Sequence, residues 1–188
     1  MRDRAASVLA KLKEKAKKSG ISYQQCLQLF FQEEFLRKLA ASEYAENFVL
    51  KGGLFIYTLT NFEGRATEDV DFLMRGLNND LADMDRVLGE ILAVPTEYDF
   101  IIFKAEKTEP ITLQQKYHGV TTQITGFIKN VRVPFKVDIG VGDIIIPKPE
   151  WRNVQTQLEV YDSRRRVFSG VECLFRTMGI KNGHAAFI

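Results

Sequence analysis

The alternation of apolar and polar positions divides the chain into helices followed by strands. Apolar residues recur at helical spacing over residues 5–18 and 23–41, and Gly20 and Ser22 mark the break between these two predicted helices. Residues 80–93 show the same spacing and predict another helix. The second helix is expected to bury one stripe of side chains, formed by Cys26, Leu27, Phe30, Phe31 and Leu36.

Strand patterns begin at Phe48. Residues 48–50 and 70–74 predict strands, and residues 54–59 predict a helix that opens directly from the turn Lys51-Gly52-Gly53. Further strands are expected over residues 100–103, 120–128, 133–139 and 157–161. N-terminal helices followed by a mixed β-sheet flanked by helices make an α+β fold.

The composition is that of one folded domain. Of the 188 residues, 45% are hydrophobic and 27% are charged, values that exclude fibrous and broadly disordered proteins. No apolar run approaches the roughly 18 residues of a membrane span, so we expect a cytoplasmic protein with no membrane partner. Because the two cysteines are isolated and the chain has two histidines, any metal chemistry must use carboxylate oxygens.

Charge is unevenly distributed although the net charge is +2. Residues 1–20 and 162–188 are basic, and the stretch between them is acidic. Basic ends around an acidic centre suit a protein that holds a polyanion near a metal-binding carboxylate cluster. A solvated, lysine-rich helix face explains the N-terminal charge without any ligand, and both interpretations stay open.

One turn and one pair of acids are candidates for chemistry. The turn Gly52-Gly53 lets the backbone approach a ligand closely, and the N–H groups that open the following helix favour phosphate. Asp69 and Asp71 lie two positions apart on a strand and share one face, where a divalent cation would relieve their repulsion. Asp83 and Asp85 have the same spacing, but on a predicted helix such side chains diverge.

A third acid, Asp138, stands among apolar neighbours in the strand predicted over residues 133–139 and could face solvent or a shared site. A Gly-Gly phosphate turn, paired aspartates and a third aspartate are together what two-metal nucleotidyl transfer requires. Oxygen ligands suit Mg²⁺ or Mn²⁺, with a nucleoside triphosphate as the substrate. In that mechanism Asp138 would orient or deprotonate an acceptor hydroxyl.

The sequence also resembles a known family. The strings Val49-Leu50-Lys51-Gly52-Gly53 and Arg65-Ala66-Thr67-Glu68-Asp69-Val70-Asp71-Phe72, with Tyr57 between them, look like the signature of the AbiE-type abortive-infection nucleotidyltransferases of the polymerase-beta-like superfamily. The segment Val137-Asp138-Ile139-Gly140-Val141-Gly142-Asp143, followed by Pro147, resembles the family's third-acid strand. The resemblance covers residues 48–161.

This resemblance implies a nucleotidyltransferase fold and a toxin of a toxin–antitoxin or phage-defence pair. Such a toxin would transfer nucleotides from a nucleoside triphosphate to an acceptor such as tRNA or another RNA, and it would have a cognate antitoxin. The expected catalytic and metal-binding residues are Asp69, Asp71 and Asp138, and the expected nucleotide-binding residues are Lys51, Gly52, Gly53, Arg65 and Thr67. For Lys51 and Arg65, an ordinary surface ion pair is the alternative to a phosphate contact.

The C-terminal part departs from the family. Related chains continue beyond the position of Tyr161 into a helix with Ala-Glu-Lys and then an Arg/Lys-Asp element, and residues 162–188 contain neither. We therefore expect an N-terminal helical segment (1–47), a nucleotidyltransferase core (48–161) and a divergent tail (162–188), which truncation or a shifted reading frame would explain. A catalytically impaired member that binds nucleotide, RNA or a partner protein without turnover is the alternative function, and an interaction module with no nucleotide role is a third.

Overall fold

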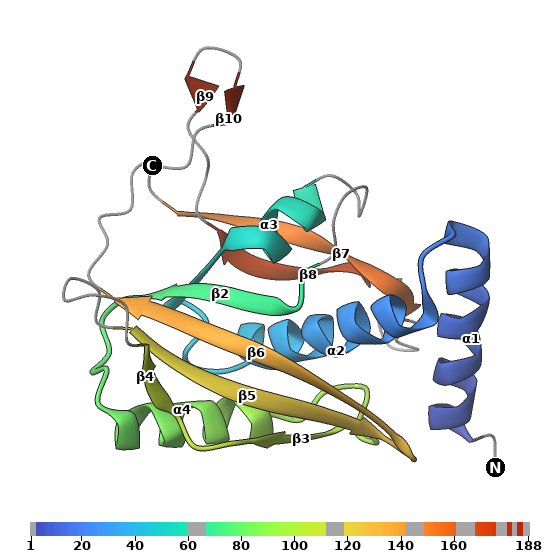
Figure 1. Cartoon of the computed structure of the whole chain (residues 1–188), viewed down its shortest axis with the longest axis horizontal. Helices are drawn as coiled ribbons and strands as arrows, with labels where there is room; N and C mark the ends of the chain where they lie inside the picture. Colours follow the sequence, from blue (N-terminus) through green and yellow to red (C-terminus); the bar gives the residue numbers. More distant parts are fainter. Residues whose placement is uncertain are drawn as a thin grey trace.

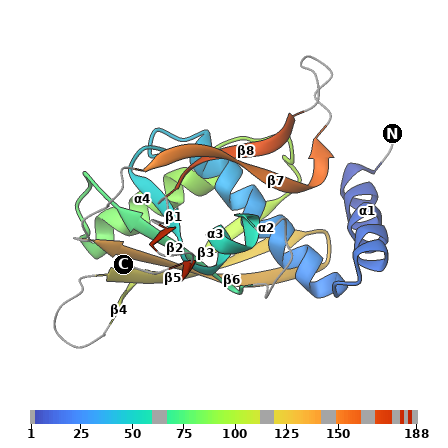
Figure 2. The same ribbon diagram turned by 90° about the horizontal axis from the view of Figure 1, so that it is seen from above.

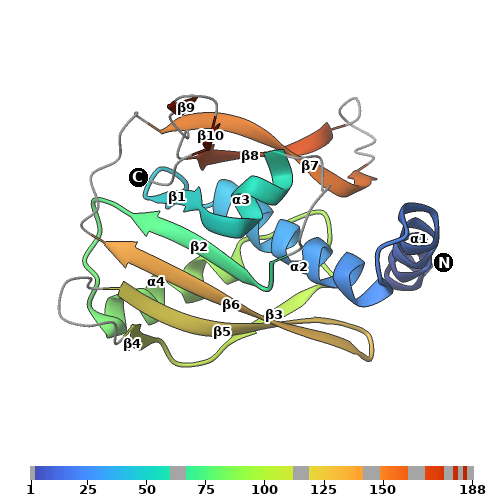
Figure 3. The same ribbon diagram turned by 45° about the horizontal axis from the view of Figure 1, so that its top comes forward.

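A twisted mixed β-sheet forms the frame of the molecule, and α2 and α4 lie against one of its faces (Figures 1 and 3). The structure is a computed structural model that describes residues 3–59, 67–111, 119–141, 149–160, 168–175, 180–181 and 184–185. The helices are α1 (Arg4–Ser19), α2 (Tyr23–Ala40), α3 (Gly52–Leu59) and α4 (Leu81–Ala93). The strands are β1 (Phe48–Lys51), β2 (Asp69–Met74), β3 (Ile102–Ala105), β4 (Glu109–Ile111), β5 (Gly119–Ile128), β6 (Val131–Val141), β7 (Glu150–Val160), β8 (Phe168–Phe175), β9 (Ile180–Lys181) and β10 (His184–Ala185).

Within the described residues, eight strands form one sheet. Their order is β3-β5-β6-β2-β1-β8-β7, with β4 also paired to β5, and β9 and β10 form a separate hairpin. Strand β2 pairs in parallel with β6 and antiparallel with β1, so the middle of the sheet is mixed. This arrangement confirms the α+β fold class.

The first two helices begin and end at residues that satisfy their terminal backbone groups. The Asp3 carboxylate accepts a hydrogen bond from the N–H of Ala6, and Ser22 and Gln25 form a capping box at the start of α2. Gly20 closes α1 with φ +74°, a left-handed conformation that costs glycine little. Helix α1 then lies beside the first turns of α2 at one end of the molecule (Figure 2).

The five residues expected to form the buried stripe of α2 are all buried, but burial extends around nearly all sides of the helix rather than along one stripe. The helix contacts α1, α4, β6, β7 and β8, because the β7-β8 end of the twisted sheet and the strand β6 approach it from different sides. Phe30, Phe31 and Phe35 are each at most 1% exposed. Helix positions that the periodicity predicts to face solvent are therefore covered by strands that lie far away in the sequence.

Polar side chains of α2 are buried with partners from other elements. Both carboxylate oxygens of Glu33 accept from the backbone N–H of Gln157 in β7, at 2.7 and 2.9 Å. Glu34 accepts from Arg37 and Thr96. Burial raises the pKa of Glu33 to about 8. These bonds tie α2 to β7 and to the segment that follows α4.

Several strand boundaries differ from those expected. Strand β3 begins at Ile102 rather than residue 100, and β7 begins at Glu150 rather than residue 157. The boundary placed at Tyr161 does not coincide with the end of the sheet, because β8 lies between β1 and β7. Strand β8 pairs in parallel with β1, although it lies more than 100 residues later in the chain. Local periodicity gives no sign of such a distant pairing. Residues 161–167, which hold the start of the predicted tail, lie outside the described part.

The buried carboxyl of Glu33 should make stability depend on pH. Its pKa of about 8 lies above the ordinary 4.5, so its contribution to stability is complete below about pH 4.5 and is lost as the pH rises towards 8. We expect Glu33→Gln to remove this loss and to be more stable than the parent at pH 8.5 by on the order of 3–5 kcal/mol. Urea unfolding at several pH values measures the difference. Glu14→Gln, on the exposed face of α1, is the control and should keep the parent's pH dependence.

Candidate active site

Four adjacent strands place four polar residues in one row. Lys51 of β1 is paired with Asp71 of β2, Asp71 with Asp138 of β6, and Asp138 with Thr121 of β5. Paired residues on neighbouring strands project from the same face of a sheet. The four side chains therefore lie on the face opposite to the one that α2 and α4 cover.

Alternation along the strands explains why this face is polar. In β6, Phe135, Val137 and Ile139 are at most 2% exposed and face the core, whereas Lys136 and Asp138 are half-buried on the other side. Asp69 lies two residues before Asp71 and is paired with Lys136. The sheet thus brings Asp69, Asp71 and Asp138 to one face, in two neighbouring rows.

Asp138 is held by two partners on this face. The Thr121 hydroxyl donates to its Oδ1 at 2.6 Å, and the Lys136 ammonium donates to its Oδ2 at 3.0 Å. Its side chain is 23% exposed. The hydrogen bond to Asp138 raises the pKa of Lys136, so this lysine remains charged beside the acids.

Ionised Asp71 is destabilised by its surroundings. Burial raises the pKa of Asp71, the charges of Asp138 and Asp69 raise it further, and those of Lys51 and Lys136 oppose the shift. The Lys51 ammonium is also close to β6, with Nζ 3.4 Å from the point that a Cβ at Gly140 would occupy. A cation near Asp71 is therefore favourable.

The two glycines of the turn are required by close contacts. A Cβ on Gly52 would lie 2.1 Å from Oδ2 of Asp71, and the residue has φ +70°. A Cβ on Gly53 would lie 3.1 Å from the side chain of Thr67. The start of α3 thus packs directly against the Asp71 carboxylate and against Thr67, two residues before the acidic strand.

Thr67 and α2 together fix the entry to β2. The Thr67 hydroxyl accepts from the N–H of Asp69 at 3.3 Å and donates to the Asp69 carbonyl at 3.2 Å. Gln32, which is fully buried in α2, donates to the carbonyls of Thr67 and Glu68, both at 3.2 Å. Gln28 donates to the Glu68 carbonyl as well. These contacts position the start of the strand that carries both aspartates.

Sequence reasoning missed three residues of this site. Alternation in the strand pairs places Lys136 and Thr121 beside Asp138, but the pairing of β5 with β6 had to be known to find Thr121. Nothing in the local sequence distinguishes Gln32 from other polar residues of a helix. Of the expected site residues, Arg65 lies outside the described residues.

The ligand atoms on this face are of the type that a hard divalent cation prefers. They are aspartate oxygens, which Mg²⁺ and Mn²⁺ prefer, and the repulsion at Asp71 is what a cation would relieve. Within the part of the chain that the structure describes, however, no three acidic, histidine or cysteine side chains form a ready-made metal-binding group. The oxygens of Asp138 are directed to Thr121 and Lys136 instead.

Comparison with protein families identifies the family of the chain. A family described as nucleotidyl transferase AbiEii toxin of type IV toxin–antitoxin systems matches residues 34–174, more than half of the chain. The chain belongs to this family. The AbiEii match extends from the second half of α2 into β8, so it includes part of the central helix and most of one strand of the tail. The resemblance recognised from residues 48–161 is thereby confirmed.

Two further comparisons add little to the AbiEii assignment. A crystal structure described as that of a "putative nucleotidyltransferase from H. pylori" is 15% identical, with a TM-score of 0.44, and the alignment covers 84% of this chain and 55% of that one. The chain therefore spans little more than half the length of that protein. A comparison with curated proteins finds no match. Among the described helices, none combines the length and the apolar character needed to cross a membrane.

The contact between Gly52 and Asp71 predicts a large cost for Gly52→Ala. A left-handed φ alone costs a residue with a Cβ about 1–2 kcal/mol, and the overlap with the Asp71 carboxylate should add at least about 1 kcal/mol to the loss of stability. Gly20→Ala is the matched control, because Gly20 has φ +74° and open space around the Cβ position. Urea unfolding of both variants measures the difference, and equal losses would contradict the close contact.

Proposed function

We propose that this chain is a metal-dependent nucleotidyltransferase that acts as a toxin and transfers nucleotides from a nucleoside triphosphate to an RNA acceptor such as tRNA. The observation that carries the proposal is the shared face on which Asp71 and Asp138 are paired, with Asp69 beside them and the Gly52-Gly53 turn against Asp71. AbiEii family membership supports the activity and a cognate antitoxin. A cytoplasmic location is part of the same proposal.

The phosphates would bind where α3 begins. The N–H groups of the first turn of α3 are not used within the helix, and such N–H groups favour an anion. The absence of side chains at Gly52 and Gly53 lets this turn pack closely against Asp71 and Thr67. Lys51 lies in the same row as Asp71, and its charge favours phosphate at this end of the sheet. Arg65 is retained in the proposal as a further phosphate contact.

The three aspartates would hold the metal and the acceptor. Asp69 and Asp71 are the proposed principal ligands, with Asp138 as the third carboxylate. Bound Mg²⁺ or Mn²⁺ would supply charge neutralisation of the triphosphate and activation of the attacking oxygen. Because Thr121 fixes one oxygen of Asp138, this carboxylate is oriented to accept a proton from an acceptor hydroxyl. The ion pair with Lys136, at 3.0 Å, holds the other oxygen of Asp138 in place.

The positive charge of α1 supports RNA as the acceptor. Helix α1 has exposed lysines, among them Lys11, Lys13 and Lys18, and its last turn is basic. Exposed lysines of this kind attract polyanions over distances of about 10 Å at moderate salt. The same helix also packs on α2, so its charge is held at a fixed place relative to the sheet.

Asp71→Asn tests the proposal. The substitution keeps the shape of the side chain and removes a charge that burial and Asp138 disfavour, so the variant should fold and be slightly more stable at pH 7. The variant should lose several kcal/mol of the stabilisation that the metal gives the transition state. Nucleotide transfer should therefore be about 100-fold slower or more than in the parent. Incorporation of labelled nucleotides into RNA with Mg²⁺ present measures the rate.

Asp83→Asn is the matched control, because Asp83 belongs to an acid pair of the same spacing but lies on α4, with a half-exposed side chain. It should transfer at the parent's rate. Unchanged transfer by Asp71→Asn would overturn the site assignment. If the parent binds a triphosphate in a Mg²⁺-dependent manner but no RNA is extended, the impaired binding protein becomes the better description.

A further inference from the structure

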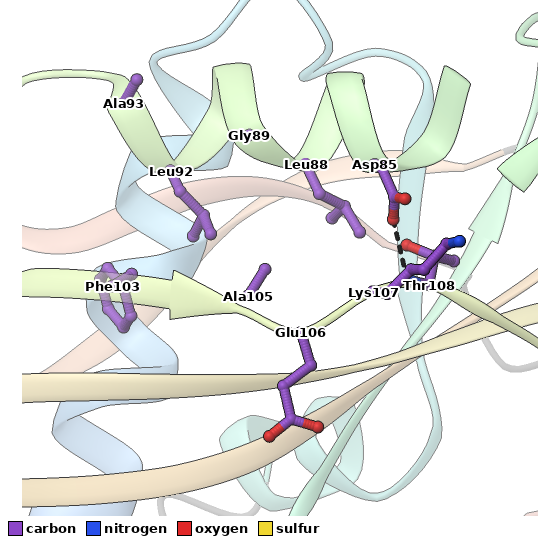
Figure 4. Close-up of a pocket in the computed structure, with 10 residues that line it drawn as sticks. All are labelled: Asp85, Leu88, Gly89, Leu92, Ala93, Phe103, Ala105, Glu106, Lys107 and Thr108. Atoms are coloured by element: carbon purple, nitrogen blue, oxygen red, sulfur yellow. Dashed lines mark hydrogen bonds between the residues drawn. The ribbon is translucent and has the colours of Figure 1, made fainter. Parts of the chain in front are cut away.

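A cavity of about 500 Å³ lies between α4 and the segment that runs from β3 to β4 (Figure 4). One of its walls is apolar and consists of Leu88 and Leu92 of α4 and Phe103 of β3. The ring of Phe103 packs edge-on against Phe31 and Phe135, so this wall is continuous with the core. The cavity therefore opens at the edge of the core face, on the side of the sheet opposite to Asp71 and Asp138.

The other end of the cavity is polar. Asp85 and Thr108 lie together there, and the N–H of Thr108 donates to Oδ1 of Asp85 at 2.8 Å (Figure 4). Thr108 is only 2% exposed, and its hydroxyl has no hydrogen-bond partner among the described residues. A buried hydroxyl without a partner costs free energy, and a ligand that bonds to it would recover that cost.

Gly89 keeps the middle of the cavity open. It lies inside α4, where glycine is about 1 kcal/mol less favourable than alanine. No atom lies within 4 Å of the point that its Cβ would occupy, so no neighbour among the described residues requires a glycine here. The missing side chain instead leaves space beside Leu88 and Leu92.

We propose that this cavity binds a small molecule with an apolar body and a protonated amine. The body would lie against Leu88, Leu92 and Phe103, and the amine would donate to the Thr108 hydroxyl and to the Asp85 carboxylate. Lys107 and Glu106, both exposed, have opposite charges that offset each other, which leaves the charge of Asp85 to select a cation. A volume of this size is typical of small-ligand sites. The proposal does not depend on the transfer reaction.

Binding of 2-phenylethylamine to the full chain tests the proposal, with backbone amide NMR shifts as the readout. We expect saturable shifts at Gly89, Ala105 and Thr108. Its anionic counterpart, 3-phenylpropionate, should bind at least about tenfold more weakly. Absence of saturable shifts at these residues, or equal binding of the amine and the acid, would overturn the proposal.

A pair of variants at one position separates binding in the cavity from binding elsewhere. Gly89→Leu fills the open space and should weaken amine binding at least about tenfold, whereas Gly89→Ala should bind like the parent. Both substitutions favour the helix, so both should fold, which thermal unfolding verifies. Asp85→Asn keeps an acceptor for the Thr108 N–H and should remove the preference for the amine over the acid. Parent-like binding by Gly89→Leu would show that the amine binds elsewhere and would refute the cavity as its site.

Discussion

The fold depends on the burial of α2 on nearly all sides. The aromatic side chains of this helix occupy the space between the twisted sheet and α4, and β7 and β8 approach it from the side opposite to β6. A buried helix must also satisfy its polar groups, which here bind distant parts of the chain: Glu33 binds β7, and Gln32 binds the segment that enters β2. The core and the position of the acidic strand are therefore fixed by the same helix.

Because side chains alternate along a strand, the packing of one sheet face against α2 places the acidic residues on the other face. Once Phe72, Phe135 and Val137 face α2, the residues between them must lie on the opposite face. The parallel register of β2 and β6 then decides which of those residues become neighbours, and it pairs Asp71 with Asp138. A shift of one residue in either strand would move its acid to the core, where an unpaired charge is expensive. Hydrophobic burial thus enforces the alignment of the carboxylates.

Like charges on this face are balanced by cations from the flanking strands. Lys51 and Lys136 both lower the cost that Asp138 and Asp69 impose on ionised Asp71. The Lys51 ammonium lies close to Gly140, where a larger side chain would compete for the same space. Such an arrangement keeps acids and lysines together near the backbone turn at Gly52.

The sequence by itself determined the class of the fold, the existence of the ten predicted elements in chain order, and the residue types of the candidate site. Periodicity and caps are local, and the spacing of Asp69 and Asp71 on a strand already requires one shared face. Tertiary structure alone decided that α2 is enclosed, that β8 lies between β1 and β7, and that Thr121 and Lys136 hold Asp138. These features depend on pairings between segments far apart in the chain, and the free energy that selects such pairings comes from burial of the whole core rather than from any local pattern.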